Sequence, residues 1–346
     1  MTDLFAPIPL KWIGPITIKG PEVSGSIDVP LATYEAPLWP STDRGAHACN
    51  AAGGITAVIL DDRMTRSVLL EGPTAEQTFA ASLSIQKRYD EIAQVISQTS
   101  RFARFLNAHI QQVANLLYIR LEMSTGDASG HNMATKAADA VLDWIITSYP
   151  TLSYVSISAN ICTDKKVSAI NGILGRGKSV TADIVIPDKL VRRYLKTTTE
   201  EIVQLNIKKN LIGSILSGAV RSANAHFANM LLGLYLATGQ DAANIIEGSQ
   251  GIVHAENRAG DLYFSVSLPN IIVGTTGSGK ELAFVQENLQ RMGCLDAQET
   301  GSNARRLAVI AAAAVLSGEL SLLAAQTNRG ELVKTHIGIE RKGGSA

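Results

Sequence analysis

The sequence predicts an α+β protein with two parts, a large helix-centred domain and a small domain inserted into it. Residues 67–157 follow the order strand, helix, strand, strand, helix, strand, which is the βαββαβ order of a ferredoxin-like unit. The segment 224–239 is apolar on nearly all sides after its polar start, which indicates a buried central helix. We therefore expect a large domain from residues 1–66 and 158–346 and a small domain from residues 67–157.

The N-terminal segment is rich in proline and glycine and predicts short strands and loops. Glu35 follows in the apolar and aromatic stretch YEAPLWP. A lone acid there is usually a solvated loop residue, but a carboxyl group shielded from water can act as a proton donor. Glu35 is therefore a candidate acid.

The inserted segment alternates between the pattern of β-strands and the pattern of helices. SVLLEG predicts a strand, residues 74–98 an amphipathic helix, residues 102–124 two strands, residues 132–150 a helix and residues 152–159 a strand. After it, residues 181–187 predict a strand, residues 189–216 helical turns, and residues 251–257 and 261–269 two more strands. The C-terminal third has the apolar pattern of helices.

The segment after the strand at 152–159 carries Asp164 and two adjacent lysines, Lys165 and Lys166. Two neighbouring ammonium groups repel each other, and one carboxylate offsets only one of the charges. The second charge is then available for an anionic ligand, or for an oxygen that becomes negative during a reaction. A solvated turn with a local ion pair is the alternative for the tripeptide alone.

Two glycine-rich segments resemble a phosphate-binding P-loop, GILGRGKS at 172–179 and GTTGSGK at 274–280. A P-loop needs a strand before it and a helix N-terminus after it. The first segment has a helical pattern before it and a strand after it. In the second, Glu281 stands where a hydroxyl group would hold magnesium. Nucleotide hydrolysis is therefore disfavoured.

The composition excludes several classes of function. Lys+Arg and Asp+Glu both number 31 in 346 residues, so no nucleic-acid-binding face is expected. Three scattered cysteines without CxxC spacing argue against disulfides and a zinc site. The N-terminus lacks the features of a signal peptide, and the apolar runs are too short for a membrane span. We expect a soluble cytoplasmic protein without a metal.

An ordered set of motifs resembles the 3-hydroxy-3-methylglutaryl-coenzyme A reductase family from about residue 20 to 342. They are STDRGA, MTR, TSRFAR, GDASGHNM, NICTDKKVSAIN, GRGKSV, LKTTTE, NAHFAN, GQDAAN, SLPNIIVGTTGSG, GELSLLAA and LVKTHI. The chain is more similar to the NADPH-using class that includes eukaryotic catalytic domains than to the second, bacterial class. Eukaryotic members carry an N-terminal membrane anchor, which we do not expect before Glu35.

The resemblance implies reduction of the thioester to mevalonate and coenzyme A with two NADPH. Lys165 matches the cation at the carbonyl oxygen, Glu35 the acid there, and Asp241 the carboxylate between them. His336 matches the imidazole that protonates the coenzyme A sulfur. Either Glu35 or Lys165 supplies the first proton.

The resemblance also implies binding residues. The positions that match the acyl-group contacts are Arg66, Ser158, Asp164, Lys166, Lys209 and Asn229, and those that match coenzyme A contacts are Ser41, Arg44 and Lys196. Cofactor contacts match Ser100, Arg101, Phe102, Asp127, Gly130, His131, Asn132, Met133, Gly274, Gly277 and Gly279. Arg101 would bind the 2′-phosphate that distinguishes NADPH from NADH. Ser129 and His131 replace methionines that are usual in the family, and Asp43 replaces an asparagine.

The family forms its active site across a dimer interface, so the resemblance implies a dimer or a tetramer. Lys165 would come from one chain, and Glu35 with Asp241 from the other. The rival reading is a protein that kept the fold and binds coenzyme A or a nucleotide without turnover.

Overall fold

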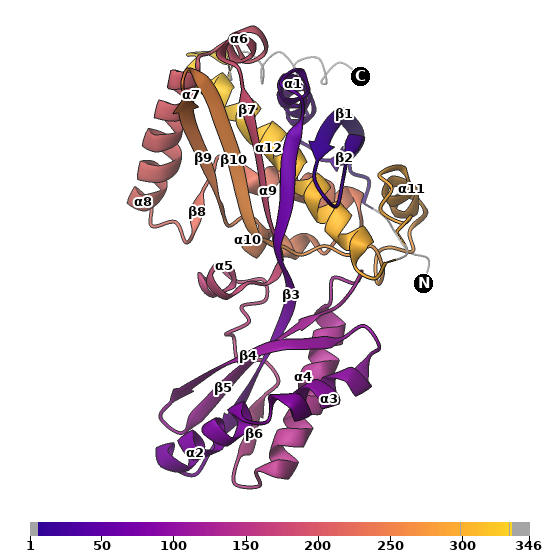
Figure 1. Cartoon of the computed structure of the whole chain (residues 1–346), viewed down its shortest axis with the longest axis vertical. Coiled ribbons are helices and arrows are strands. Elements are labelled where there is room, and N and C mark those ends of the chain that lie inside the picture. The colour runs from indigo at the N-terminus through magenta and orange to yellow at the C-terminus, as the bar shows by residue number, and fades with distance from the viewer. Residues whose placement is uncertain (1–5, 298, 332, 334–346) are drawn as a thin grey trace.

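The computed structural model describes residues 6–297, 299–331 and 333, and it has a mixed α+β architecture (Figure 1). Its strands are β1 (Leu10–Lys19), β2 (Gly25–Ala32), β3 (Ile55–Glu71), β4 (Arg104–Val113), β5 (Leu116–Ser124), β6 (Ser153–Ser156), β7 (Gly177–Ile186), β8 (Ser222–Ala223), β9 (Gly251–Arg258) and β10 (Asp261–Ile271). Its α-helices are α1 (Leu38–Ala51), α2 (Ala75–Gln86), α3 (Tyr89–Thr99), α4 (His131–Ser148), α5 (Ile170–Leu174), α6 (Asp188–Leu190), α7 (Thr199–Leu205), α8 (Ser214–Leu216), α9 (Phe227–Ala237), α10 (Ile245–Gly248), α11 (Ala283–Arg291) and α12 (Ser302–Thr327). The other helical segments are two π-helical turns, η1 (Val191–Leu195) and η2 (Asn206–Gly213), and a 3-10 turn, η3 (Ala242–Asn244).

The long strand β3 belongs to both parts of the molecule (Figure 1). Its first half pairs with β7 in antiparallel register between residues 56 and 63, in the sheet order β2-β1-β3-β7-β10-β9-β8. Its second half pairs with β5 from Met64 to Glu71 and with β6 near its end. The predicted boundary at residue 66 therefore falls inside a continuous strand and not in a loop.

The smaller part has its own sheet, in the order β4-β5-β3-β6, and its own buried core. Residues 74–98, which we expected to form one helix, form α2 and α3 instead. The helix breaks because Arg88 leaves the helical conformation, with φ −115° and ψ 30°. Its guanidinium group pairs with Glu91 at 2.6 Å and lies 4.5 Å from the ring centre of Trp144. The interactions of one charged side chain thus override the periodicity.

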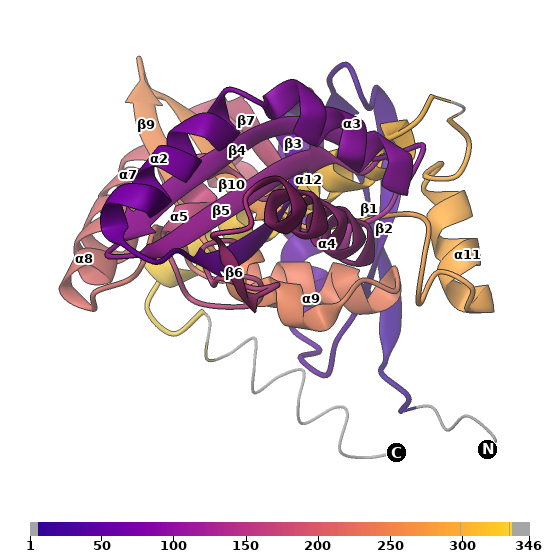
Figure 2. The same ribbon diagram turned by 90° about the horizontal axis from the view of Figure 1, so that it is seen from below.

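The larger part is built around α12, not around the helix near 224–239 as expected. Twenty of the 26 residues of α12 are buried, and α1, α9 and the strands β7 and β10 pack around it. In α9, Ala228 and Asn229 remain exposed, so this helix is buried on one side only. At the borders of this core, α7 and α8 lie at one edge of the large part and α11 at the other (Figure 2), and α7 and α11 each add buried side chains to it.

The helix α12 is also long and apolar enough to cross a membrane, with a mean hydropathy of 2.1 over its most apolar window. That window is 94% buried inside the protein. The apolar composition therefore serves the interior of the fold, where a helix that is apolar on all sides is expected.

The contact between α1 and α12 depends on a glycine. A Cβ atom at Gly45 would overlap the main-chain carbonyl oxygen of Ser317, which lies in the middle of the buried helix. Because a buried backbone cannot move aside without disturbing its neighbours, only glycine fits at this crossing.

We predict that Gly45→Ala lowers the free energy of unfolding by about 1–3 kcal/mol, because the added methyl group overpacks the interior. Urea denaturation followed by circular dichroism measures this. The control is Gly213→Ala in a π-helical turn, where the nearest atom would lie 3.8 Å from the new Cβ. A loss of stability as large in the control would contradict the packing explanation.

Candidate active site

The site is organised around the loop of residues 157–169, which connects β6 to α5 (Figure 1). Asn160, Thr163 and Lys165 have positive φ values of 58°, 40° and 56°. Non-glycine residues adopt this conformation at a cost and cluster at functional sites. The main-chain nitrogen of Lys165 donates to the carboxylate of Glu247 at 3.2 Å, which helps to hold the strained backbone in place.

Lys165 forms an ion pair with Asp241, with 2.5 Å between Nζ and Oδ2. Asp241 also accepts a hydrogen bond from the backbone nitrogen of Ala243 at 3.1 Å and so caps the turn η3. The hydrogen bond to Asp241 raises the pKa of Lys165. Burial alone would raise the pKa of Asp241, but the bonds from Lys165 and Ala243 outweigh it and lower this pKa. Both groups therefore stay charged at neutral pH.

This pair corrects one expectation. Asp241 approaches Lys165 within a single chain and does not have to be supplied by a second one. The reason is topological: the turn η3 follows α9 directly and lies next to α10, whose Glu247 holds the Lys165 backbone.

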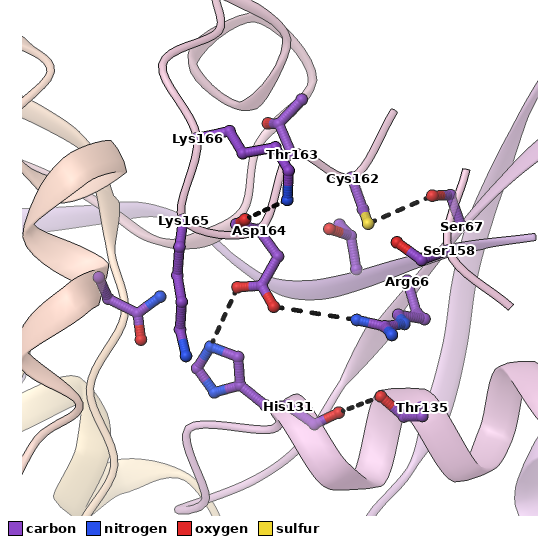
Figure 3. Close-up of polar contacts among 12 residues, drawn as sticks. Arg66, Ser67, His131, Thr135, Ser158, Cys162, Thr163, Asp164, Lys165 and Lys166 are labelled. Atoms are coloured by element: carbon purple, nitrogen blue, oxygen red, sulfur yellow. Dashed lines mark hydrogen bonds and ion pairs between the residues drawn. The ribbon is translucent and has the colours of Figure 1, made fainter. Parts of the chain in front are cut away.

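Asp164 lies among cations (Figure 3). Its carboxylate accepts a hydrogen bond from Arg176 at 2.8 Å and lies 3.8 Å from Arg66 and 3.6 Å from His131. Lys166 is exposed and turns back to donate to the backbone oxygen of Asp164 at 2.9 Å. The carboxylate of Asp164 is thus paired with Arg176, and both Asp164 and Lys165 line a cavity, while Lys166 is exposed.

Arg176 and Glu247 are site residues that the sequence analysis did not find. Arg176 is 1% exposed and also donates to the backbone oxygen of Thr65 at 2.7 Å. Glu247 is fully buried, 3.5 Å from Arg176, and burial raises its pKa. The arginine stands within GRGKSV, one of the family motifs, so a signal was present in the sequence.

A cavity of about 560 Å³ joins the charged loop to the start of α4 and to the glycine-rich segment at 274–280. It is lined by Arg66, Ala128, Ser129, Gly130, His131, Asn132, Met133, Thr135, Asp164, Lys165, Asp241, Thr276, Gly277, Ser278 and Lys280. The first turn of α4 faces this space, with Gly130 at φ 94° as its N-cap. A helix N-terminus offers free N–H groups to an anion. Burial, together with Arg176, lowers the pKa of His131, which therefore stays neutral at pH 7.

The two remaining glycines of the second segment permit close packing. A Cβ atom at Gly274 would overlap the backbone of Ser129, so the glycine lets this loop approach the start of α4. Gly279 has a φ of 82° and faces Gly239 just as closely. Both glycines thus shape the wall of the cavity.

A second cavity, of about 240 Å³, contains other predicted residues. Glu35 accepts a hydrogen bond from Asn229 there at 2.8 Å, and Ser41, Arg44 and His226 line the same space. The guanidinium group of Arg44 forms an ion pair with the carboxylate of Glu331, with 2.5 Å between Nη1 and Oε1. The chain therefore does not bring Glu35 into the cavity of Lys165 and Asp241.

A third cavity, of about 650 Å³, is basic. It is lined by Arg101, Phe102, Arg104, Arg305 and the turn at Gly126, among others. Arg101 lies over the ring of Phe102, 4.6 Å from its centre. Gly126 lines this cavity and Ala128 lines the cavity of Lys165, so the two cavities meet across one turn.

The other predicted residues lie outside these cavities or have structural roles. Asp127 caps α12, accepting from the nitrogens of Gly301 and Ala304 at 2.9 and 3.0 Å. Burial lowers the pKa of Lys209, whose ammonium group donates to Asn210 at 3.0 Å. The remaining residues are Ser100 at the end of α3, Ser158 in the loop after β6, and Lys196 after η1. His336 lies outside the described residues.

Comparisons with known proteins agree on one family. The family model described as hydroxymethylglutaryl-coenzyme A reductase matches residues 5–341. A curated 3-hydroxy-3-methylglutaryl-coenzyme A reductase of Phycomyces blakesleeanus is 44% identical over 97% of this chain and 29% of its own length. Those of Pyrococcus horikoshii and Aeropyrum pernix are 41% and 40% identical, over 92% and 97% of this chain and 78% and 80% of their own lengths.

The fold is shared with a solved structure of much lower identity. A class II 3-hydroxy-3-methylglutaryl-CoA reductase from Streptococcus pneumoniae, bound to NADPH in open conformations, matches with a TM-score of 0.75 at 18% identity. The match covers 94% of this chain and 86% of that one. The chain spans less than a third of the fungal relative and about four fifths of the archaeal ones. By the match along nearly its whole length, the chain belongs to the hydroxymethylglutaryl-coenzyme A reductase family.

Proposed function

We propose that this chain reduces 3-hydroxy-3-methylglutaryl-coenzyme A to mevalonate and coenzyme A, the reaction of the mevalonate pathway, using two NADPH. The observation that carries the proposal is the Lys165–Asp241 ion pair on the wall of the 560 Å³ cavity. The side chains of the pair are 37% and 43% exposed, so a ligand can reach the ammonium group. A preorganised cation beside a carbonyl oxygen stabilises the negative charge that hydride addition creates.

The fit of NADPH rests on two features of the cavities. The start of α4 and the glycine-rich loop offer backbone N–H groups. The adjoining cavity holds Arg101 and Arg104 for an anionic phosphate, while Arg305 there is paired with Glu22 and Glu299. Two NADPH molecules, bound in turn, would supply one hydride each. In this proposal Arg101 binds the 2′-phosphate and Gly130 to Met133 lie along the dinucleotide.

The residues of the chain then have distinct tasks. Lys165 holds the carbonyl oxygen as it becomes negative, and Asp241 keeps the ammonium group charged and in place. Arg66 contributes a positive charge for the free carboxylate of the substrate. The departing thiolate takes up a proton, which in this proposal comes from His336. Glu35 is the acid that completes the site.

The separation of Glu35 from Lys165 supports a site completed by a second copy of the chain. Glu35, Ser41, Arg44 and Asn229 share one cavity, and Lys165 and Asp241 share another. A site that needs both sets is incomplete in one chain. We therefore include a homodimer, alone or within a tetramer, in the proposal, with each site built from two chains.

The proposal also assigns the two parts of the chain. The strand order β4-β5-β3-β6, with all neighbours antiparallel, supports a ferredoxin-like cofactor domain at residues 67–157. Residues 1–66 and 158–346 would bind the substrate and coenzyme A. A cytoplasmic location is consistent with the burial of α12.

We predict that the chain oxidises NADPH when the thioester is added, and that Lys165→Ala lowers turnover by at least about 100-fold, because the oxyanion loses its cation. Absorbance at the nicotinamide band measures this. Lys189→Ala, at an exposed lysine of α6, is the control and should turn over normally. A protein that only binds its ligands would oxidise neither NADPH nor NADH.

Arg101→Gln should weaken NADPH binding about tenfold or more and leave NADH binding unchanged, because only NADPH carries the 2′-phosphate. Titration of the nicotinamide fluorescence measures both affinities. Equal losses for the two cofactors would remove the role assigned to Arg101.

Mixed oligomers test the shared site. Co-expressed Glu35→Ala and Lys165→Ala chains should regain about a quarter of wild-type activity, since half of the dimers are mixed and each has one intact site. The matched control combines Lys165→Ala with Asp241→Ala chains. It should stay inactive, because these residues pair within one chain. Recovery in the control, or none in the first mixture, would contradict the arrangement.

A further inference from the structure

Lys280 is a buried lysine on the wall of the catalytic cavity. It ends the glycine-rich segment between β10 and α11 and is only 5% exposed, yet it lines the same space as Lys165 and Asp241. Its ammonium group donates to the backbone oxygen of Gly239, and to that of Ser278 at 3.4 Å. Within the described ranges it has no carboxylate at ion-pair distance. A buried ammonium group held only by carbonyl oxygens requires an explanation.

The loop that Lys280 holds is the one that carries Asp241. Gly239 lies two residues before Asp241. Gln240, which lies between them, forms two hydrogen bonds with the glycine-rich segment. Its side chain donates to the backbone oxygen of Gly274 and accepts from the nitrogen of the same residue, both at 3.0 Å. Lys280 therefore adds a charged bond to an existing contact between two loops.

The loops approach so closely that no side chain fits between them. A Cβ atom at Gly239 would overlap the carbonyl oxygen of Gly279, and one at Gly279 would press against that of Gly239. Both glycines have positive φ values, 62° and 82°. The position of Asp241 is thus set by a rigid contact of which Lys280 is the charged part.

The charge of Lys280 also acts on Asp241 directly. Burial lowers the pKa of Lys280 to about 8, while the negative charges of Glu281 and Asp241 act in the opposite direction. Asp241 consequently lies between the ammonium group that it contacts, Lys165, and a second one. The other charged or titratable groups on the cavity wall are Arg66, His131 and Asp164.

We propose that Lys280 is a positioning residue of this active site: its ammonium group fixes the Gly239 carbonyl and stabilises ionised Asp241, and so keeps Lys165 directed into the cavity. The inference rests on the proposed reductase activity.

The charge on Lys280 makes this role depend on pH in one direction. Below about pH 8 the side chain is an ammonium group and supports Asp241, and above it the amine is neutral and the support is lost. A merely steric role would not change with pH, because the amine fills the same space in both forms.

The experiment compares the wild type with Lys280→Met over a range of pH. Methionine has a similar length and no charge. Below about pH 7, kcat should be about tenfold lower in the variant, with the KM for NADPH nearly unchanged. As the pH rises through about 8, the ratio of the wild-type kcat to the kcat of the variant should fall from about ten toward one. A ratio that does not change with pH would overturn the proposal.

Two further variants make the outcome specific. Lys178→Met removes a lysine that is 3% exposed and paired with Asp62 at 3.1 Å. The ratio of the wild-type kcat to the kcat of this variant should not vary with pH. Glu281→Gln removes an exposed charge that favours the ammonium form of Lys280, so the pH dependence should move to lower pH.

The variants also separate the possible failures. If Lys280→Met does not fold, as judged by circular dichroism, the Glu281→Gln profile decides: an unchanged profile overturns the proposal. A wild type that turns over neither cofactor overturns the reductase function and this inference with it. An active wild type with a pH-independent ratio overturns only the role of Lys280.

Discussion

The guanidinium group of Arg176 is the contact on which the geometry of the site depends. It lies at the meeting point of β3, the loop of residues 157–169 and α10, and it bonds Thr65, Asp164 and Glu247. Each of these partners belongs to a different element. Because a buried charge that loses its partner costs several kcal/mol, this side chain ties the three elements together. The bond from the Lys165 backbone to Glu247 joins the loop to α10 a second time.

Much of the fold followed from the sequence, for identifiable reasons. The overall α+β class and most strands were predicted because apolar patterns and turn residues are local signals. The single helix expected at 74–98 was wrong because the conformation of Arg88 is set by Glu91 and by Trp144, which is distant in the chain. The central helix was misassigned because two apolar helices compete for the interior, and burial depends on what packs against each one.

The chemical groups of the site could be predicted from the sequence, but not which of them share a cavity. The family resemblance implied Lys165 and Asp241, and the chain brings them together. Nothing in a linear pattern indicates that Glu35 lies in a separate cavity, that Asp127 caps a helix, or that Arg176 and Lys280 are buried. Those properties come from contacts between residues far apart in the sequence.

The strand β3 has a mechanical consequence. The smaller part is joined to the larger by this continuous strand on one side and by the loop of residues 157–169 on the other (Figure 1). A strand that is hydrogen-bonded along both halves resists stretching and yields mainly by twisting. The second connection is the loop that carries Lys165. Torsion of the smaller part about β3 therefore also moves the loop that carries Lys165.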